Sequence, residues 1–227
     1  MTITATGVCK DFIRQGKNTN KLTAVSPTDI TIEAGKLYVL MGRSGSGKTT
    51  LLNMLAGLLT PSSGKVLCDG EDIYALDDEK LSRFRCEHIG VIPQGQTAVH
   101  SLNVLENICL SYMLYGSLKE REAAYPAARE LMRKLGIAGL ENEMPSALSG
   151  GELRRVAIAR AMLRKPDVLF ADEPTCDLDD ENTALVLQTL KETAQSSTAV
   201  FVVTHERDAV GYADICLNMS GGSIGKQ

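Results

Sequence analysis

Residues 42–49 read Gly-Arg-Ser-Gly-Ser-Gly-Lys-Thr and fit the pattern G-x-x-x-x-G-K-[ST] at every fixed position. The run before them, 37–41, is short, apolar and bounded by glycines, so it predicts a buried strand. The segment from Thr49 to Leu59 carries leucines at helical spacing and stops before Pro61. A strand, a glycine turn and a helix start in this order predict a phosphate-binding loop rather than a chance Gly/Ser turn.

The residue types in this loop suit the binding of a polyphosphate. Its glycines let backbone N–H groups point inward, Lys48 can reach the β- and γ-phosphates, and the hydroxyl of Thr49 can bind Mg²⁺. The start of the following helix favours an anion by about 0.3–1 kcal/mol when exposed. The ligand-binding residues that we predict here are Gly42, Arg43, Ser44, Gly45, Ser46, Gly47, Lys48, Thr49 and Thr50.

Composition narrows the class of protein. A chain of 227 residues with 44% apolar content can form one large α/β domain or two small ones. A net charge of −4 gives no basic field for nucleic acid, so we expect no such partner. Six cysteines stand singly without a C-x-x-C pair, which is typical of reduced thiols in a cytoplasmic protein. The N-terminus does not resemble a signal peptide, and no apolar run approaches about 18 residues.

The first 35 residues predict three short strands, at 3–8, 22–25 and 29–32, with a polar turn over 14–21. Phe12 follows the first of them as a lone aromatic in a polar neighbourhood. It can be a surface for stacking a base, or a half-buried core residue.

A charged helical segment at 78–87 leads into a second buried strand at 89–92, and Gln94 follows two residues later. In a doubly wound sheet, ligands lie beyond the carboxyl ends of the strands, so Gln94 is a candidate ligand residue. Taken alone, Gln94 is better interpreted as a glutamine in a surface loop.

Residues 102–140 have helical periodicity and no strand-like stretch, which predicts a helical insertion. A further helix opens at Ser149 and runs to about Lys165. Ser149 and Glu152 fit a capping box, which explains both without any function. The glycines at 150–151 are not explained in this way, because glycine in a helix costs about 1 kcal/mol relative to alanine, so they suggest a second anion site.

Two more buried strands end in chemically active side chains. The run 168–171 is followed by Asp172 and Glu173, of which the first can orient Mg²⁺ and the second can polarise a water molecule. A helix is predicted over 181–195, and the strand at 199–203 is followed by His205. A surface or core histidine is the default for His205 alone, but the other strand ends already point to one site.

This set of motifs resembles the ATP-binding-cassette ATPases over nearly the whole chain. The matching stretches are GRSGSGKTT from 42 for Walker A, Gln94 for the Q-loop and LSGGE from 148 for the family signature. They continue with VLFADEP from 168 for Walker B, Asp179 for the D-loop and His205 for the H-loop. The resemblance implies an α/β fold: a phosphate-loop (RecA-like) ATPase core, an N-terminal antiparallel β subdomain and an inserted α-helical subdomain. We expect a single domain over 1–227, with the helical part at about 96–160.

The resemblance also implies a role for each matched residue in binding and hydrolysing ATP with Mg²⁺. Phe12 stands where an aromatic ring stacks on adenine, Thr49 and Gln94 would ligate Mg²⁺, and Asp172 would hold its water shell. The catalytic residues implied are Glu173, which would polarise water, His205, which would contact the γ-phosphate, and Lys48.

In this family Ser149, Gly150 and Gly151 face the γ-phosphate bound by the other subunit, and the match to the D-loop adds Asp179 to the nucleotide-binding residues. The resemblance therefore implies a dimer of this chain, or a pair with a like subunit, that closes around two ATP molecules. It would drive separate transmembrane permease subunits through the surface around Gln94, at the inner face of the cell membrane.

The segment 69–94 and the polar turn before Leu22 resemble the subgroup that serves lipoprotein release, macrolide or antimicrobial-peptide efflux and cell-division complexes. Two stretches depart from the family pattern. Residues 95–98 read Gly-Gln-Thr-Ala where an aromatic residue and leucines are usual, which bears on the grip on the membrane partner. Residues 152–154 read Glu-Leu-Arg rather than a glutamine run, and this change leaves the serine and glycines of the signature intact.

Two other functions fit parts of the pattern. A soluble ABC-type ATPase acting on DNA or ribosomes usually has tandem cassettes, a long coiled-coil insertion or a basic surface. This chain has one cassette, about a hundred residues between Lys48 and Ser149, and an acidic charge. A phosphate-loop kinase would need an acceptor site and has no use for the signature.

Overall fold

The structure is a computed structural model that describes residues 1–14, 20–95 and 97–226, so most of the polar turn predicted at 14–21 lies outside the described residues. The strands are β1 (Ile3–Arg14), β2 (Asn20–Ile32), β3 (Leu37–Met41), β4 (Ser63–Cys68), β5 (Glu71–Asp72), β6 (Ile89–Ile92), β7 (Val168–Asp172), β8 (Ala199–Thr204), β9 (Ile215–Ser220) and β10 (Ser223–Lys226). The helices are α1 (Lys48–Leu55), α2 (Asp78–His88), α3 (Val104–Ile108), α4 (Leu110–Tyr115), α5 (Leu118–Lys134), α6 (Gly150–Met162) and α7 (Asp180–Gln195).

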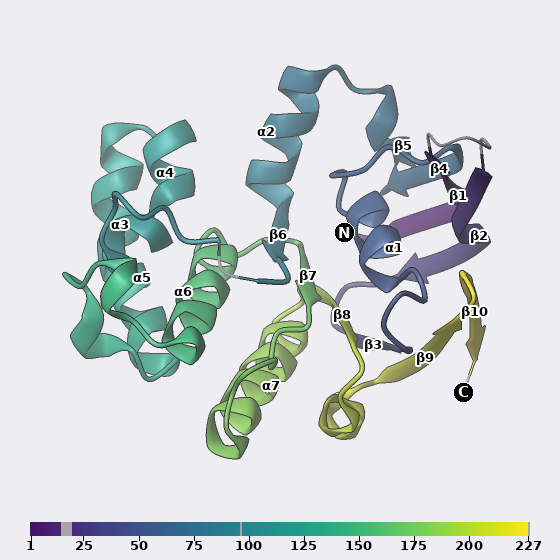
Figure 1. Cartoon of the computed structure of the whole chain (residues 1–227). Helices are drawn as coiled ribbons and strands as arrows, with labels where there is room; N and C mark the ends of the chain where they lie inside the picture. Colours follow the sequence, from purple (N-terminus) through teal and green to yellow (C-terminus); the bar gives the residue numbers. More distant parts are fainter. Residues whose placement is uncertain (15–19, 96, 227) are drawn as a thin grey trace.

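These strands form two sheets. The larger has the order β10-β9-β3-β8-β7-β6, and its strands run parallel except for β10. The smaller is antiparallel, with the order β2-β1-β4-β5. Figure 1 shows the smaller sheet on one side of the larger and the helices α3 to α6 gathered on the other. The expected combination of an α/β core, an antiparallel β subdomain and a helical subdomain is confirmed.

The larger sheet is buried on both faces, which explains why its strands read as continuous apolar runs. Along β7, Phe170 packs with α1 and the smaller sheet, whereas its neighbours Leu169 and Ala171 pack with the helices on the opposite face. Helix α1 contributes Leu51 and Leu55 to the core that faces the smaller sheet. The phosphate-binding loop is thereby held between two packed layers.

The N-terminal strands differ from the prediction. Instead of three short strands, β1 and β2 form one long antiparallel pair, in which Ile3 lies opposite Ile32 and Phe12 opposite Leu22. The register shifts at three places between Ala5 and Asp11. These irregularities break the alternation of apolar and polar residues, so the pattern shows only fragments of each strand. The strands β9 and β10 were not predicted at all.

The four parallel strands predicted at 37–41, 89–92, 168–171 and 199–203 are confirmed, the last two extending by one residue each. Residues 102–140 hold α3, α4 and α5, which confirms a helical region. Helix α1 ends four residues earlier than predicted, because Gly57 takes a left-handed φ of +69°. Over the described residues, no helix combines the length and the apolar character needed to cross a membrane.

Candidate nucleotide site

The loop between β3 and α1 has a backbone that two of its glycines make possible. Gly47 has a φ of +104°, and a Cβ atom there would lie 2.3 Å from the carbonyl oxygen of Ala24 on β2. A Cβ on Gly42 would lie 2.5 Å from the carbonyl oxygen of Met219 on β9. Neither position has room for a side chain, so both neighbouring strands fix the path of the loop.

The first turn of α1 begins at this loop, and its N-cap, Gly47, offers no side-chain acceptor to the N–H groups of the turn. The ammonium group of Lys48 donates to the carbonyl oxygens of Gly42 at 2.8 Å and Arg43 at 3.2 Å. Lys48 is only 6% exposed. A buried cation and a set of outward N–H groups make this loop a site for an anion.

The loop borders two adjacent hollows. The first, of about 180 Å³, is lined by Ala24, Ser44, Gly45, Gly47, Lys48, Thr49, Thr50, Gln94 and Glu173. The second, of about 560 Å³, is lined by residues that include Gly42, Arg43, Ser46, His205 and Arg207. The structure therefore brings the predicted loop residues together with Gln94, Glu173 and His205, which come from the ends of three other strands.

Asp172 lies at the end of β7 and is 3% exposed. Its Oδ1 atom is buried without a hydrogen-bond partner among the described residues. Burial raises the pKa of this carboxyl, and the hydroxyl of Thr49 beside it acts in the opposite direction. An unpartnered carboxylate oxygen next to a threonine hydroxyl is a donor set that suits Mg²⁺.

Glu173 is fixed in place by its backbone conformation and by hydrogen bonds that the sequence does not indicate. Its φ is +48°, a left-handed value that is unfavourable for a residue with a side chain, and its N–H donates to the carbonyl oxygen of Val203 at 2.9 Å. Its carboxylate accepts from the hydroxyl of Thr204 at 2.9 Å and is 3.0 Å from Nδ1 of His205. The carboxylate is thus anchored on β8 while it lines the smaller hollow.

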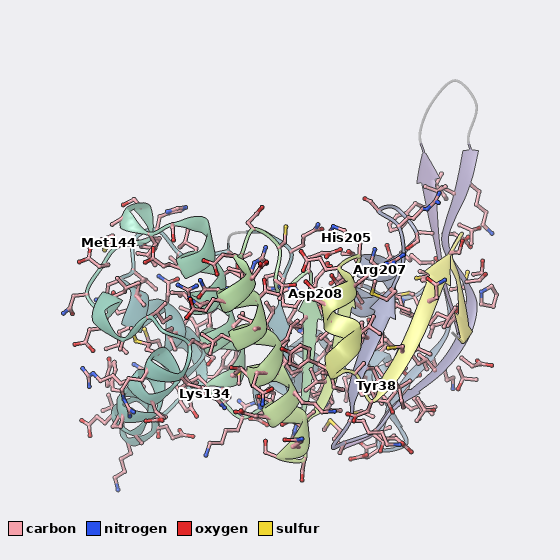
Figure 2. All side chains as sticks on the ribbon, turned by 90° about the horizontal axis from the view of Figure 1, so that it is seen from below. Tyr38, Lys134, Met144, His205, Arg207 and Asp208 are labelled. Carbon is pink, nitrogen blue, oxygen red and sulfur yellow. The ribbon has the colours of Figure 1, made fainter. Side chains whose placement is uncertain are left out.

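His205 is the exposed partner of this pair. Its side chain is 60% exposed, against 8% for Glu173. The hydrogen bond with Glu173, and then the charge of that carboxylate, raise the pKa of His205. Figure 2 shows His205 and Arg207 close together, well apart from Lys134.

Ser149, Gly150, Gly151 and Asp179 line a separate hollow of about 420 Å³ together with Asp177 and other residues. The predicted capping box is present, because the hydroxyl of Ser149 accepts from the N–H of Glu152 and the carboxylate of Glu152 accepts from the N–H of Ser149. Asp179 caps α7 by accepting from the N–H of Asn182 at 2.8 Å. The structure does not bring this group into the hollows of the phosphate-binding loop.

Phe12 lines none of these three hollows. It is 40% exposed near the end of β1, and the ammonium group of Lys10 lies 5.6 Å from the centre of its ring. It belongs to neither hydrophobic core of the described residues, which favours the stacking interpretation over the core one.

Sequence reasoning missed several residues of the site, among them Ala24, Thr204 and Arg207. Ala24 touches the loop only through the packing of β2, for which the sequence carries no signal. Thr204 and Arg207 flank His205, so their position beside a strand end could have indicated them.

A glycine-rich loop at the end of β3, a buried lysine and an acidic pair at the end of β7, the next strand but one in the sheet, define a phosphate-loop nucleoside triphosphatase. Comparison with known proteins identifies the family within this class. The family model described as "ABC transporter" matches residues 25–176, so the chain belongs to the ABC transporter family. It is an ATPase of that family, which binds and hydrolyses ATP.

Two relatives show the range of proteins that contain such a chain. The chain is 36% identical over 223 residues to the lipoprotein-releasing system ATP-binding protein LolD of Syntrophotalea carbinolica, covering 98% of this chain and 96% of that protein. It is 38% identical over 205 residues to the macrolide export ATP-binding/permease protein MacB 2 of Aeromonas hydrophila. That match covers 90% of this chain but only 31% of the larger protein.

Among solved structures, the chain is similar to the dimeric structure of MJ0796, a bacterial ABC transporter cassette. The TM-score is 0.90 with 30% identity, and the match covers 99% of this chain and 98% of that one. A second structure of MJ0796, described as a post-hydrolysis state bound to ADP and Pi, matches with a TM-score of 0.89.

Proposed function

We propose that this chain powers a transporter whose membrane-spanning subunits are separate chains, and that it extracts or exports a lipoprotein, a peptide or a drug. The observation that carries the proposal is the hollow in which the phosphate-binding loop faces Gln94 and Glu173. The relative LolD, matched over 96% of its length, is named as the ATP-binding protein of a lipoprotein-releasing system. In this proposal the chain lies in the cytoplasm, bound to the inner face of the cell membrane through its permease partner.

The loop would hold the β- and γ-phosphates of ATP. The amides of the first turn of α1 and the ammonium group of Lys48 are the donors, and Lys48 exchanges its bonds to loop carbonyls for bonds to phosphate. Ser44, Gly45, Ser46 and Thr50 line the surface around the phosphates. Arg43 faces the adjacent hollow, where it adds positive charge beside the loop.

The residues at the foot of the loop fit Mg²⁺. Asp172 offers a buried oxygen without a partner among the described residues, Thr49 offers a hydroxyl, and Gln94 offers an amide oxygen at the rim of the same hollow. When bound, Mg²⁺ neutralises charge on the β- and γ-phosphates. Asp172 would hold the water shell, while Thr49 and Gln94 would bind directly.

Glu173 and His205 would act on the reaction itself. Glu173 would accept a proton from the attacking water, because its backbone N–H is bonded to β8 and its two carboxylate oxygens contact Thr204 and His205. His205, the exposed member of the pair, would donate to the γ-phosphate. Phe12 would stack on adenine, since its ring is half-exposed at the end of β1.

The separate hollow at Ser149 would complete the site of a second subunit. Its helix N-terminus and its glycines are features of an anion site, yet it is not part of the hollows around the loop in the same chain. In a dimer with two-fold symmetry, each loop would meet the Ser149–Gly151 group of its partner, with Asp179 beside it. The MJ0796 cassette, described as dimeric, supports this arrangement.

Replacing Glu173 with glutamine tests the catalytic assignment. The Glu173→Gln variant should bind ATP as the wild type does but hydrolyse it about 10²–10⁴-fold more slowly, the usual contribution of a positioned general base. Turnover is measured as phosphate release and binding by titration with a fluorescent ATP analogue. Equal turnover in the two proteins would remove Glu173 from the mechanism.

The mass in solution of the Glu173→Gln variant tests the dimer. MgATP should convert it from monomer to dimer, because hydrolysis no longer reopens the pair. A variant that binds ATP and stays monomeric would contradict the composite site for this chain on its own.

Import of a small molecule is a second candidate function, favoured by a relative. The chain is 38% identical over 209 residues to the methionine import ATP-binding protein MetN 2 of Pseudomonas aeruginosa and covers 62% of it. Purifying the native complex in mild detergent and identifying its membrane subunits would separate the two candidates. Salt-sensitive binding of DNA or RNA by the pure protein would instead favour the soluble alternative.

A further inference from the structure

The two sheets both end in an edge strand on the same side of the molecule (Figure 1). These edges are β2 in the smaller sheet and β10 in the larger one. The N–H of Ser26 in β2 donates to the carbonyl oxygen of Gly222, in the turn before β10, at 2.8 Å. Among the described residues, no further backbone hydrogen bond joins β2 to β10 beyond this point. The two edges therefore meet at one end and are unpaired with each other along the rest of their length.

A hollow of about 550 Å³ lies between the two edges. Its apolar lining includes Ile30 on β2, Ile215 and Leu217 on β9, and Ile224 on β10. These side chains belong to the core under the smaller sheet or pack against it, so this core reaches the surface in the hollow. The hollow shares no lining residue with the hollows of the phosphate-binding loop and of the Ser149 group. It is a surface that the proposed function does not use.

The part of β2 that borders the hollow, residues 28–33, is suited to pair with another strand. Edge strands are often blocked by proline or lysine, and this stretch contains neither. Ile30 and Ile32 pack with the core, whereas the alternate residues Asp29 and Glu33 are exposed. A strand added to this edge would share the same alternation, with one set of side chains over the apolar lining and the other set toward solvent.

The charge of the hollow restricts which strand can pair. Asp29 and Glu33 line it, and no cationic side chain of the described residues does so. Oδ1 of Asp29 accepts from the N–H of Gly7 at 2.6 Å, and Glu33 forms an ion pair with Lys36. The charge of Asp29 is thus balanced by no side chain among the lining residues. Another copy of this edge would bring the same carboxylates and be repelled, whereas a basic strand is complementary.

We propose that the edge of β2 over 28–33 binds an extended segment of another protein in which apolar and basic side chains alternate. Main-chain hydrogen bonds to β2 supply affinity, as in other cases of strand addition, and the side chains supply specificity. The apolar side chains would lie over Ile215 and Ile224, and the basic ones beside Asp29. A segment along 28–33 spans about 20 Å.

The probe is a capped synthetic peptide of about seven residues, long enough to span this edge, in which lysine and valine alternate. It should bind saturably to the full-length chain without nucleotide, and the amide NMR signals that shift should be those of β2, β9 and β10. Peptides with glutamate in place of lysine, or serine in place of valine, should bind about tenfold more weakly or less. Absence of saturable binding, or shifts confined to other surfaces, would overturn the proposal.

Methylation of the peptide nitrogens tests the main-chain pairing. One peptide is methylated at every lysine nitrogen and another at every valine nitrogen, because the N–H groups of alternate residues point to opposite sides of a strand. At least one of them should bind about tenfold more weakly, since it loses several hydrogen bonds to β2. Equal binding of all three peptides would show a site that recognises organic cations through side chains alone, and would overturn strand addition.

A charge variant tests the acidic side of the hollow. Asp29→Asn with Glu33→Gln removes both charges and keeps an acceptor for the N–H of Gly7. It should weaken the lysine–valine peptide by about 3–10-fold and reduce the salt dependence of binding. The matched control, Asp78→Asn with Glu79→Gln at the exposed start of α2, should bind as the wild type does. An equal loss in the control would show attraction to the net acidic charge of the chain and overturn the proposal.

The solution mass of the nucleotide-free chain separates a foreign strand from a second copy. The chain should stay monomeric as its concentration rises. Self-association that shifts the same amide signals of β2 and β10 would assign the edge to a second copy and overturn the proposal. The peptide series uses the unaltered chain, so it remains decisive even where a variant fails to fold.

Discussion

Two residues of the site adopt arrangements that lower the stability of the folded protein. Asp172 is a buried carboxylate with one oxygen that has no partner among the described residues, and Glu173 has a left-handed backbone. Both conditions cost stability, and both place an oxygen where the loop can use it. For Asp172, whose cost lies in its buried charge, a neutral replacement of the same shape should therefore stabilise the free protein.

Asp172→Asn should raise the thermal stability of the nucleotide-free protein at neutral pH. Burial raises the pKa of the Asp172 carboxyl, so ionising it at neutral pH favours the unfolded chain, and an amide of the same shape avoids that cost. A gain of about 1 kcal/mol corresponds to about 2–4 °C in a chain of this size. Calorimetry checks the shift, and MgATP should stabilise the variant less than the wild type. A lower midpoint would contradict the assignment.

The pair formed by His205 and Glu173 should be visible in a titration. Because the pKa of His205 is raised, the contribution of the pair is fully present below the ordinary value of 6.5 and is lost as pH rises through the raised value. In Glu173→Gln the pKa of His205 should fall back toward 6.5. Proton NMR of the His205 imidazole ring measures this change. If the pKa of His205 is unchanged in Glu173→Gln, then Glu173 is not the group that raises it.

At the scale of elements, the packing of α6 on β6 controls where Gln94 lies. Gly90→Ala would put a methyl group 2.5 Å from the carbonyl oxygen of Ala161, so the helix must shift away from the strand. We expect a loss of about 1–3 kcal/mol in stability, typical of overpacking, together with a weaker ATP-dependent dimer. Chemical denaturation and solution mass measure the two effects. A stable variant with a normal dimer would show that the close packing is not needed.

The same elements show what a sequence can predict. Strands buried on both faces of a sheet appear in the sequence as continuous apolar runs. The bounds predicted from such runs at 37–41 and 89–92 agree with the structure at both ends. The strands β1 and β2 were fragmented because their register shifts destroy the period of two. The loop glycines could be predicted from their pattern, whereas Ala24 could not, since it contacts the loop only through tertiary packing.

The arginines of α6 show a further limit of prediction. The family signature drew attention to Ser149 and its glycines, but nothing in the spacing of Arg154 and Arg160 indicates which loop they contact. Their partners are main-chain and hydroxyl oxygens about sixty residues earlier in the chain. Such contacts leave no pattern in one sequence, because every residue carries a main-chain carbonyl oxygen that can accept a hydrogen bond.

At the scale of the whole molecule, we propose that 1–227 is one domain, with a helical subdomain over about 96–160. Its two proposed nucleotide surfaces, the loop and the Ser149 group, belong to different hollows. A two-fold dimer would use both surfaces of each chain at once, so each site would need one surface from each partner.

This reciprocity predicts that two inactive variants restore each other. Lys48→Ala removes the phosphate-binding cation but keeps the Ser149 surface, and Ser149→Arg blocks that surface but keeps the loop. In a mixed dimer, one site receives both defects and the other receives neither. Random pairing of equal amounts should therefore give roughly a quarter of wild-type turnover, since half of the dimers are mixed and each has one intact site.

ATP hydrolysis by the mixture, compared with each variant alone, measures this restoration. The control is a chain that carries both substitutions, mixed with either single variant, because no pairing then contains an intact site. Restored turnover in the first mixture and none in the control require the two surfaces to come from different chains. A first mixture no more active than its components would contradict the shared site. A Ser149→Arg chain that is active on its own would show that hydrolysis does not need the partner's Ser149, and the Ser149 capping box would then have a purely structural role.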